Sequence, residues 1–240
     1  LEHGHIYGQC NGLIEAGGTL KQVYDPDVRR LKAFKVHYPH VEVVDSFEKL
    51  LEDHSVHTVV SAAIPSERAG IGMKVLDSGK DYFTDKSPFT TLEQLDEVKA
   101  RVTKTSRKYM VYYSERLHSE SGFWAGELVE NGAIGDVLQV LITAPHRLSK
   151  STRPHWFFNK RRYGGILTDI GSHQFEQFLS YTRAKDGIVN FARVENFNSP
   201  DKPGLEDFGE ASMTTDNGVS CYCRMDWFTP DASPVWGDGR

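Results

Sequence analysis

The chain has 240 residues, of which 39% are hydrophobic and 25% are charged, and its formal net charge is -5. This is ordinary globular composition, with enough length for one large domain or two modest ones. The small, dispersed charge excludes the strongly basic surface that binds nucleic acid or an anionic membrane, so we expect small molecules or other copies of the chain as partners.

The first half of the chain alternates short apolar runs with segments of helical period, the pattern of βαβ units and a parallel sheet. The predicted strands are 19–24, 58–63, 81–84 and 109–114, and the predicted helices are 29–37, 68–78 and one that opens at Thr91. Gly79 is a stop signal for the second helix, and Thr91 with Gln94 has the spacing of a capping box. The helix faces that we expect to be buried comprise Leu31, Phe34 and Val36, and Leu92, Leu95, Val98 and Val102.

After about residue 117 the pattern of the sequence changes and predicts longer strands. A helix is predicted at 122–131, and strands are predicted at 137–142, 188–197, 208–215 and 219–228. Asp216-Asn217-Gly218 predicts a hairpin with a type I′ turn, which needs positive φ at both central residues. Parallel units followed by antiparallel strands predict two domains, residues 1–117 and 118–240.

The cysteines Cys10, Cys221 and Cys223 are an odd number in a chain too long to depend on disulfides, which predicts a reducing, cytoplasmic location. Cys221 and Cys223 could in principle ligate a metal, but no second Cys or His pair is near them in sequence. We therefore predict no metal site, with both thiols on one face of a strand. No apolar run approaches the roughly 20 residues that span a bilayer, so no membrane partner is expected.

The first candidate site is at the start of the chain. The turn His3-Gly4-His5 enters a helical segment that begins with Ile6, and Asp25 follows the next predicted strand. This is the layout of a dinucleotide site, in which the pyrophosphate lies at the helix N-terminus and the carboxylate accepts from a ribose hydroxyl. An ordinary βαβ turn, with Asp25 on the surface, fits the spacing equally well.

The second candidate is Asp85-Lys86-Ser87-Pro88, directly after the predicted strand 81–84. Ligands of open α/β sheets bind outside the carboxyl ends of the strands. Lys86 could there hydrogen-bond a reacting hydroxyl and stabilise charge that develops on its oxygen. Taken alone, the motif is explained more simply as a solvated Asp-Lys pair before a helix.

The third candidate runs from Gly164-Gly165 to Asp169 and His173. Because Asp169 and His173 are four residues apart, one helix would place both on the same face. A histidine oriented by a carboxylate is a natural general base near neutral pH, and the glycines would admit a ligand or make a turn. A helix start capped by Asp169, with His173 as its partner, is an equal alternative.

The order of the second and third motifs resembles the paired signature of the Gfo/Idh/MocA oxidoreductases, which include inositol, glucose-fructose and dihydrodiol dehydrogenases. The resemblance covers essentially the whole chain. It implies an α/β fold, with a Rossmann-type parallel-sheet domain followed by an α/β domain that has a largely antiparallel open sheet. It further implies that Lys86, Asp169 and His173 form the catalytic group, with His173 as the acid/base.

The resemblance also assigns the remaining site residues. The residues implied to bind the cofactor are Gly4, His5, Ile6, Asp25, Ala63, Pro65, Asp85 and Lys86. The residues implied to shape the substrate pocket are Tyr113, Arg116, His155 and Trp156. The cofactor is expected to be NAD, because the Asp25 carboxylate repels a 2′-phosphate, while Arg29 and Arg30 keep NADP open as an alternative.

The chain departs from the family pattern in three respects. The usual glycine fingerprint would fall just before Leu1, on Glu2 and on His5, so we expect Gly4 to serve the tight turn instead. Ser87 stands where the family usually has proline. The first Rossmann strand and the C-terminal end are expected to be missing, which would leave strand edges unpaired and cofactor binding by this chain weak or absent.

The predicted function is therefore hydride transfer between NAD(P) and a hydroxyl-bearing carbon of a sugar, polyol or related compound. One alternative is an NAD-dependent glycoside hydrolase of the same family. Another is a non-catalytic cofactor-binding scaffold. We also expect a homo-oligomer formed through the C-terminal sheet.

Overall fold

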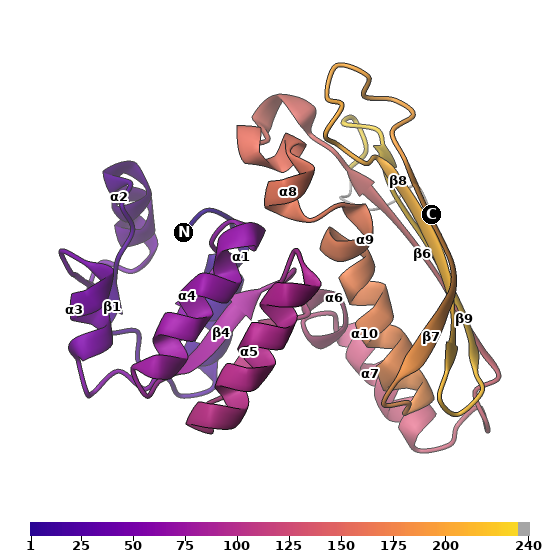
Figure 1. Cartoon of the computed structure of the whole chain (residues 1–240), viewed down its shortest axis with the longest axis horizontal. Helices are drawn as coiled ribbons and strands as arrows, with labels where there is room; N and C mark the ends of the chain where they lie inside the picture. Colours follow the sequence, from indigo (N-terminus) through magenta and orange to yellow (C-terminus); the bar gives the residue numbers. More distant parts are fainter. Residues whose placement is uncertain (235–240) are drawn as a thin grey trace. The chain divides into compact units, whose positions relative to one another are not determined.

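The computed structural model describes residues 1–234 and divides the chain into two compact units, Leu1–Tyr112 and Tyr113–Arg240 (Figure 1). The division thus follows Tyr112, whereas the sequence analysis set its domain boundary after residue 117. None of the helices in the described residues is long and apolar enough to cross a membrane.

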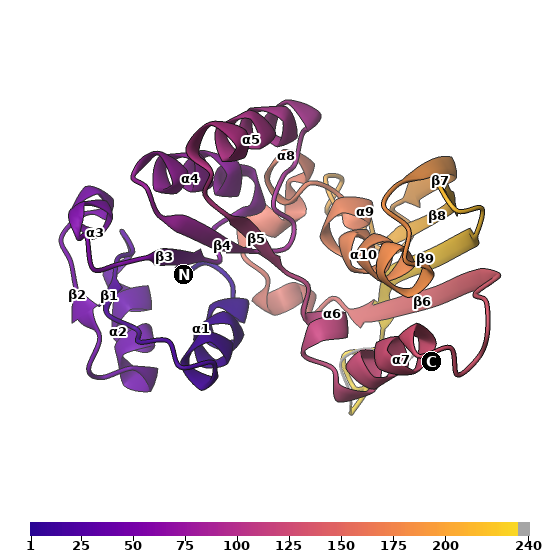
Figure 2. The same ribbon diagram turned by 90° about the horizontal axis from the view of Figure 1, so that it is seen from below.

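The first unit contains two parallel sheets. Its elements in chain order are α1 (His5–Glu15), β1 (Gln22–Val23), α2 (Val28–His37), β2 (Glu42–Val43), α3 (Phe47–Glu52), β3 (Thr58–Ser61), α4 (Pro65–Asp77), β4 (Asp81–Asp85), α5 (Leu92–Thr105) and β5 (Tyr109–Tyr112). One sheet is β1-β2 and the other is β3-β4-β5. Figure 2 shows α4 and α5 along one face of the second sheet and α1 on the other face. The predicted Rossmann-like parallel architecture is confirmed.

The two sheets are interrupted between β1 and β3. These strands belong to separate sheets, and a cavity of about 510 Å³ lies between them, lined by residues of β1, β3 and α1 that include Val23, Val59 and Cys10. Unpaired strand edges were expected here. β1 has only the pairs Gln22–Glu42 and Val23–Val43 and is shorter than the strand predicted at 19–24.

The predicted helix start at Thr91 and the predicted stop at Gly79 agree with the structure, whereas α4 begins at Pro65, three residues before its predicted start. Helix α5 begins after Thr91, whose side chain accepts from the backbone N–H of Gln94 at 3.3 Å. The Gln94 side chain accepts in return from Thr90 N–H at 2.8 Å, one residue earlier than in a standard capping box. Helix α4 is followed by Gly79, which has φ of +79° and could not be replaced there without strain.

Two of the predicted buried side chains are exposed. Phe34 and Val98 are each 2% exposed, as their helices require, but Val36 is 80% and Leu92 is 75% exposed. Val36 is two positions from Phe34, about 200° around the helix, and Leu92 is turned about 120° from Val98. Both predictions were wrong because they considered only that the side chain is apolar and ignored its angular position around the helix relative to the buried face.

The second unit is a four-stranded sheet covered by helices. Its elements are α6 (Ser114–Leu117), α7 (Glu120–Glu130), β6 (Gln139–Arg147), η1 (Lys150–Thr152), η2 (His155–Phe158), α8 (Lys160–Tyr163), α9 (Ile166–Asp169), α10 (Gly171–Thr182), β7 (Gly187–Glu195), β8 (Phe208–Thr215) and β9 (Ser220–Thr229). The strand order is β6-β9-β8-β7. β7, β8 and β9 are antiparallel neighbours and β6 runs parallel to β9, so the sheet is mixed and mostly antiparallel, as predicted.

The hairpin between β8 and β9 is present, but its predicted turn type is wrong. Gly218 has φ of +87°, whereas Asn217 is not among the residues with positive φ. The N–H of Gly218 donates to Thr215 O at 2.9 Å. This is the arrangement of a type I turn followed by a left-handed glycine, which needs positive φ at one position only.

The core of the second unit lies between β9 and the helices α9 and α10. Cys221 and Cys223 are both fully buried within it, which confirms that the two thiols share one face of a strand. On β7, by contrast, Ile188 is 74% and Val189 is 53% exposed. The sheet therefore has an apolar, exposed strand at its β7 edge.

The three cysteines are expected to react slowly with alkylating reagents in the native protein. All are unpaired, and burial raises the pKa of Cys10 to about 11 and that of Cys223 to about 12. A pKa of about 11 leaves roughly 100-fold less thiolate at neutral pH than an ordinary thiol has. Iodoacetamide labelling followed by mass spectrometry should thus modify the cysteines in urea but not in buffer. Rapid native labelling of any of the three would contradict their burial.

Candidate active site

In the first unit, the start of α1 is held against the loop that follows β3. The backbone N–H of His3 donates to Ala62 O at 3.1 Å. Gly4 precedes the helix and is open, since a Cβ placed on it would meet nothing within 4 Å. Space is therefore open beside Gly4 at the start of α1, which is 11 residues long. The N–H groups of Ile6 and Tyr7 in its first turn donate to His3 O and Gly4 O, each at 3.2 Å.

Gly8 is a further residue of this motif that the sequence analysis missed. A Cβ on Gly8 would lie 2.6 Å from the hydroxyl oxygen of Tyr112, so α1 packs closely against the end of β5. Close helix–strand packing is the role of the third glycine in a dinucleotide-binding turn. The sequence contains this signal as Gly4-x-x-x-Gly8. It was not recognised because the family's fingerprint places its third glycine at position 5.

Asp25 lies beyond the end of β1 and is buried, which excludes its alternative interpretation as a surface loop residue. Its carboxylate accepts from the backbone N–H of Asp27 at 2.8 Å and lies 3.5 Å from Arg30 Nη1. Arg30 also pairs with Glu2 at 2.6 Å, and Arg29 pairs with Asp27 at 2.8 Å. Arg29 and Arg30, the two residues that made NADP an alternative cofactor, thus both contact carboxylates of their own unit.

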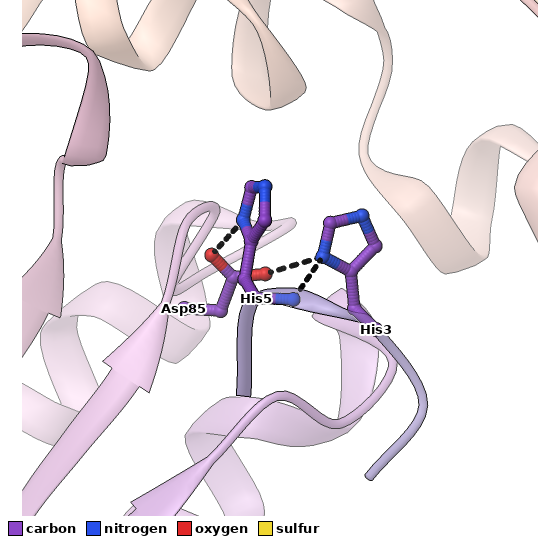
Figure 3. A group of neighbouring side chains, drawn as sticks. All are labelled: His3, His5 and Asp85. Atoms are coloured by element: carbon purple, nitrogen blue, oxygen red, sulfur yellow. Dashed lines mark hydrogen bonds and ion pairs between the residues drawn. The ribbon is translucent and has the colours of Figure 1, made fainter. Parts of the chain in front are cut away.

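Asp85 is the last residue of β4 and Lys86 follows it, and both are buried, so they are not a solvated surface pair. Figure 3 shows the rings of His3 and His5 facing the Asp85 carboxylate. His5 Nδ1 lies 2.9 Å from Oδ1, and His3 Nδ1 lies 3.2 Å from Oδ2. The backbone N–H of Lys86 donates to Oδ1 at 2.8 Å.

This arrangement shifts the ionisation of two of these groups. Burial alone would raise the pKa of Asp85, but the hydrogen bonds from His3 and His5 and the charge of Arg68 outweigh it and hold the pKa well below its usual value. Burial lowers the pKa of His3, which favours its neutral imidazole. Asp85 is therefore a carboxylate throughout the physiological pH range.

Arg68 is the buried residue that holds the two loops together, and the sequence analysis missed it. Its Nε donates to Ala63 O at 2.7 Å, its Nη1 donates to Lys86 O and to Ser87 O, and its Nη2 lies 3.2 Å from Asp85 Oδ2. A guanidinium offers five N–H donors in a rigid fork, which suits it to several acceptors at once. Arg68 thereby fixes both loops at the carboxyl ends of β3 and β4.

In the second unit, Asp169 and His173 do not share one helix as predicted. α9 ends at Asp169 and α10 begins at Gly171, with Ile170 between them. Gly164 and Gly165 have φ of +95° and +93°, and the N–H of Ile166 donates to Glu206 at 2.9 Å. Since Glu206 accepts at the start of α9 and Asp169 lies at its end, the alternative of Asp169 as an N-cap is also wrong.

Both residues remain buried side chains of the second unit, at 8% exposure for Asp169 and 3% for His173. Burial lowers the pKa of Arg153, and the negative charge of Asp169 opposes that shift, so the two charges are neighbours. Arg153 also lies 4.3 Å above the ring of Phe157. Asp169 thus has a half-buried cation as a neighbour, which was not predicted from the sequence.

His173 lies beside a carboxylate and a second imidazole. Oε1 of Glu115 is 4.0 Å from His173 Nε2 and 3.3 Å from His146 Nε2. The ring of Tyr113 is edge-on to that of His173, with 5.9 Å between centroids. The segment 113–116 had been assigned to the substrate pocket through Tyr113 and Arg116, but Glu115 is the residue of that segment whose carboxylate approaches His173.

The remaining predicted pocket residues have different surroundings. Arg116 is paired with Glu176, with Nε 2.9 Å from Oε1 and 3.0 Å from Oε2. His155 is exposed on η2, and Trp156 is partly buried against the core of the second unit. The candidate site residues thus lie in two local groups: His3, His5, Asp85 and Lys86 in the first unit, and Tyr113, Glu115 and His173 in the second. Asp169 is a neighbour of Arg153.

Two protein-family models match the chain. The model described as an oxidoreductase family with an NAD-binding Rossmann fold matches residues 4–113. The model described as the GFO/IDH/MocA C-terminal domain matches residues 124–237. The two matches follow one another in the order that the paired motifs predicted.

The chain is also similar to solved structures. A protein from Erwinia carotovora atroseptica, described as an oxidoreductase, is 47% identical with a TM-score of 0.96, over 99% of this chain and 71% of that one. Levoglucosan dehydrogenase, in complex with NADH and levoglucosan, is 18% identical with a TM-score of 0.78, over 89% of this chain and 59% of that one. At the latter identity the likeness shows the fold alone.

Two curated relatives match over shorter regions. An uncharacterised oxidoreductase of Schizosaccharomyces pombe is 24% identical over 143 residues, which are 60% of this chain and 38% of that protein. The D-xylose dehydrogenase of Paenarthrobacter nicotinovorans is 26% identical over 131 residues, 52% of this chain and 34% of the enzyme. The matched region thus spans little more than a third of either relative's own length.

Proposed function

The chain belongs to the Gfo/Idh/MocA family of NAD-binding oxidoreductases, and from this membership we propose that it is a dehydrogenase acting on the CH–OH group of a sugar, polyol or related compound. The observation that carries the proposal is the burial of Lys86, Asp169 and His173, three of the charged and titratable residues of the two paired motifs. Burying such groups is costly unless they are paired, and they are concentrated at functional sites. The similarity to a D-xylose dehydrogenase supports a carbohydrate substrate.

The residues of the first unit fit a dinucleotide. The open space beside Gly4 at the start of α1 suits the pyrophosphate, and the buried carboxylate of Asp25 suits a ribose hydroxyl. Ala63 and Pro65, at the carboxyl end of β3, would lie along the cofactor, and Asp85 would lie beside the nicotinamide ribose. When bound, NAD supplies the nicotinamide C4 that accepts or donates hydride.

The chain's own residues would manage the proton and the developing charge. His173 takes the proton of the substrate hydroxyl as general base and returns it in the reverse direction. The Lys86 ammonium hydrogen-bonds the same oxygen and stabilises its negative charge. Asp169 balances the charge of the group, while Tyr113, Arg116, His155 and Trp156 would shape the pocket around the substrate.

The preference for NAD over NADP is expected to depend on Asp25. Replacing Asp25→Asn removes the negative charge that repels a 2′-phosphate, so the ratio of the NADP and NAD dissociation constants should fall by roughly tenfold. Fluorescence titrations with NADH and NADPH measure both constants. Asp45→Asn is the matched control, because Asp45 is exposed and pairs with Lys49. An unchanged ratio in Asp25→Asn would remove Asp25 from the cofactor site.

A substrate screen tests the proposed function. Sugars, inositols and diols are offered with NAD and with NADP, and net formation of NADH is followed by absorbance. Net NADH with a free sugar or polyol supports the dehydrogenase. Cleavage of an aryl glycoside without net NADH would instead identify a glycoside hydrolase, and cofactor binding without any turnover across the panel would identify a scaffold.

We also propose that the protein works in the reducing cytoplasm as a homo-oligomer. The three buried, unpaired cysteines support the first point. The exposed apolar side chains on β7, among them Ile188 and Phe191, support an interface through the sheet of the second unit. Sedimentation equilibrium of the wild type against Ile188→Lys tests the interface, since the charge should dissociate an oligomer formed there.

A further inference from the structure

We propose that His3, His5 and Asp85 form a binding site for a divalent transition-metal cation. The two imidazole nitrogens and a carboxylate oxygen, one atom from each residue, all lie within 4.8 Å of one another (Figure 3). This is the only such group of three potential ligands in the described residues. The site shares His5 and Asp85 with the proposed cofactor site, but metal binding goes beyond the proposed dehydrogenase function and can be measured without any nucleotide.

The distances suit a metal. His5 Nδ1 is 2.9 Å and His3 Nδ1 is 3.2 Å from the oxygens of Asp85. Around a cation with bonds of about 2.1 Å, neighbouring ligand atoms are about 3.0 to 3.4 Å apart in octahedral or tetrahedral geometry. The two distances run to different Asp85 oxygens, and a set with one atom from each residue spans up to 4.8 Å, so the two rings would have to turn inward for all three residues to coordinate one cation. Two imidazoles and one carboxylate also leave coordination positions open for water or an anionic oxygen.

The carboxylate is held in place from behind. Arg68 Nη2 lies 3.2 Å from Asp85 Oδ2, and the backbone N–H of Lys86 donates to Oδ1 at 2.8 Å. Ligating carboxylates in metal sites are themselves hydrogen-bonded by outer residues in this way. Asp85 is 1% exposed, so its position does not depend on the cation.

The nitrogen of His3 is in a conflicted position without a cation. The backbone N–H of His5 points at His3 Nδ1 from 3.4 Å, which calls for a lone pair on that nitrogen. The hydrogen bond from His3 to the Asp85 oxygen at 3.2 Å instead needs a proton on that nitrogen, so it cannot satisfy both neighbours at once. A cation coordinated by His3 Nδ1 and the Asp85 oxygen would take the place of that proton, and the His5 N–H, as a first-turn donor of α1, could turn to water.

The ligand types select among cations. Imidazole suits Zn²⁺, Co²⁺, Ni²⁺ and Fe²⁺, whereas Mg²⁺ and Ca²⁺ prefer sites made wholly of oxygen. We therefore expect Co²⁺ and Zn²⁺ to bind and Mg²⁺ not to compete. The alternative is that both histidines only donate hydrogen bonds to Asp85, and the experiment must separate these two roles.

The test is a Co²⁺ titration of the chelator-treated chain without an affinity tag, followed by visible absorption. We expect one Co²⁺ per chain with a Kd of about 10 μM or less, displacement by Zn²⁺, and no displacement by millimolar Mg²⁺. His3→Ala and His5→Gln should each weaken binding at least about tenfold. His5→Gln decides between the roles, because glutamine can still donate to Asp85 but is a poor ligand.

The control is His54→Ala, which alters an exposed histidine of the same unit and should bind Co²⁺ like the wild type. Thermal melts followed by circular dichroism show that each variant is folded, and Zn²⁺ should raise the Tm of the wild type but not that of His5→Gln. The proposal is overturned if Co²⁺ keeps the spectrum of the aquo ion, if His5→Gln binds as tightly as the wild type, or if His54→Ala loses the site.

Discussion

Replacing His173 or Lys86 with alanine is expected to abolish turnover of the substrate while the Kd for NADH stays within about tenfold of the wild-type value, a difference of roughly 1.4 kcal/mol. His173 is the proposed acid/base, and Lys86 the proposed donor to the reacting oxygen. Neither role is needed to hold the adenine, ribose or pyrophosphate of the cofactor. Removing either side chain should therefore affect the chemical step far more than cofactor binding.

The measurement combines steady-state kinetics on the substrate found in the screen with NADH fluorescence titration. His40→Ala and Lys49→Ala are matched controls, because both change an exposed side chain of the same type. His173→Gln is a second variant that preserves polarity and volume but cannot act as a base near neutral pH. An unchanged kcat in His173→Ala or in Lys86→Ala would exclude the proposed catalytic role of that residue.

Most of the secondary structure could be predicted from local signals in the sequence. The strand 208–215 was predicted to the residue as β8, and Thr91 was identified as the cap of α5. Such features depend on neighbours within a few positions, which is the range over which period and capping rules act. The family assignment succeeded for a related reason, since two short motifs in a fixed order identify a fold that each alone does not.

What could not be predicted depends on contacts between distant segments. His5 and Asp85 are 80 positions apart, and Arg68 and Asp85 are 17 apart, yet they form one buried cluster. Nothing in the local pattern distinguishes Arg68 from an exposed arginine on an amphipathic helix. Glu115 was passed over similarly, because a four-residue segment does not tell which of its side chains faces His173.

The break between α9 and α10 was not predicted, for a different reason. The prediction assumed that a spacing of four residues means one helix, but the residues 166–169 and 171–182 form two. The backbone at Ile170 keeps helical angles, with φ of -86° and ψ of -47°. The N–H of His173 donates to Ile170 O, three residues back, so the bonding pattern changes without a sharp turn. Sequence period cannot detect such a change.

Arg68→Met is expected to destabilise the first unit by about 3 to 5 kcal/mol, the cost of breaking a buried charged pair by removing one partner. Methionine fills much of the same volume, so the loss arises from the polar groups that Arg68 leaves behind. These are the Asp85 carboxylate and the carbonyl oxygens of Ala63, Lys86 and Ser87. Arg68→Lys should recover only part of the loss, because one ammonium cannot reach acceptors on two loops.

Urea unfolding followed by circular dichroism measures the change in the free energy of unfolding, with Arg101→Met as the matched control. Arg101 pairs with Asp77 on the surface of the same unit, and exposed pairs contribute at most about 1 kcal/mol. A loss in Arg68→Met no larger than in Arg101→Met would show that the buried network does not hold the loops. If the network does hold them, Arg68→Met should also weaken NADH binding, because Ala63 and Asp85 are both proposed cofactor residues that contact this one side chain.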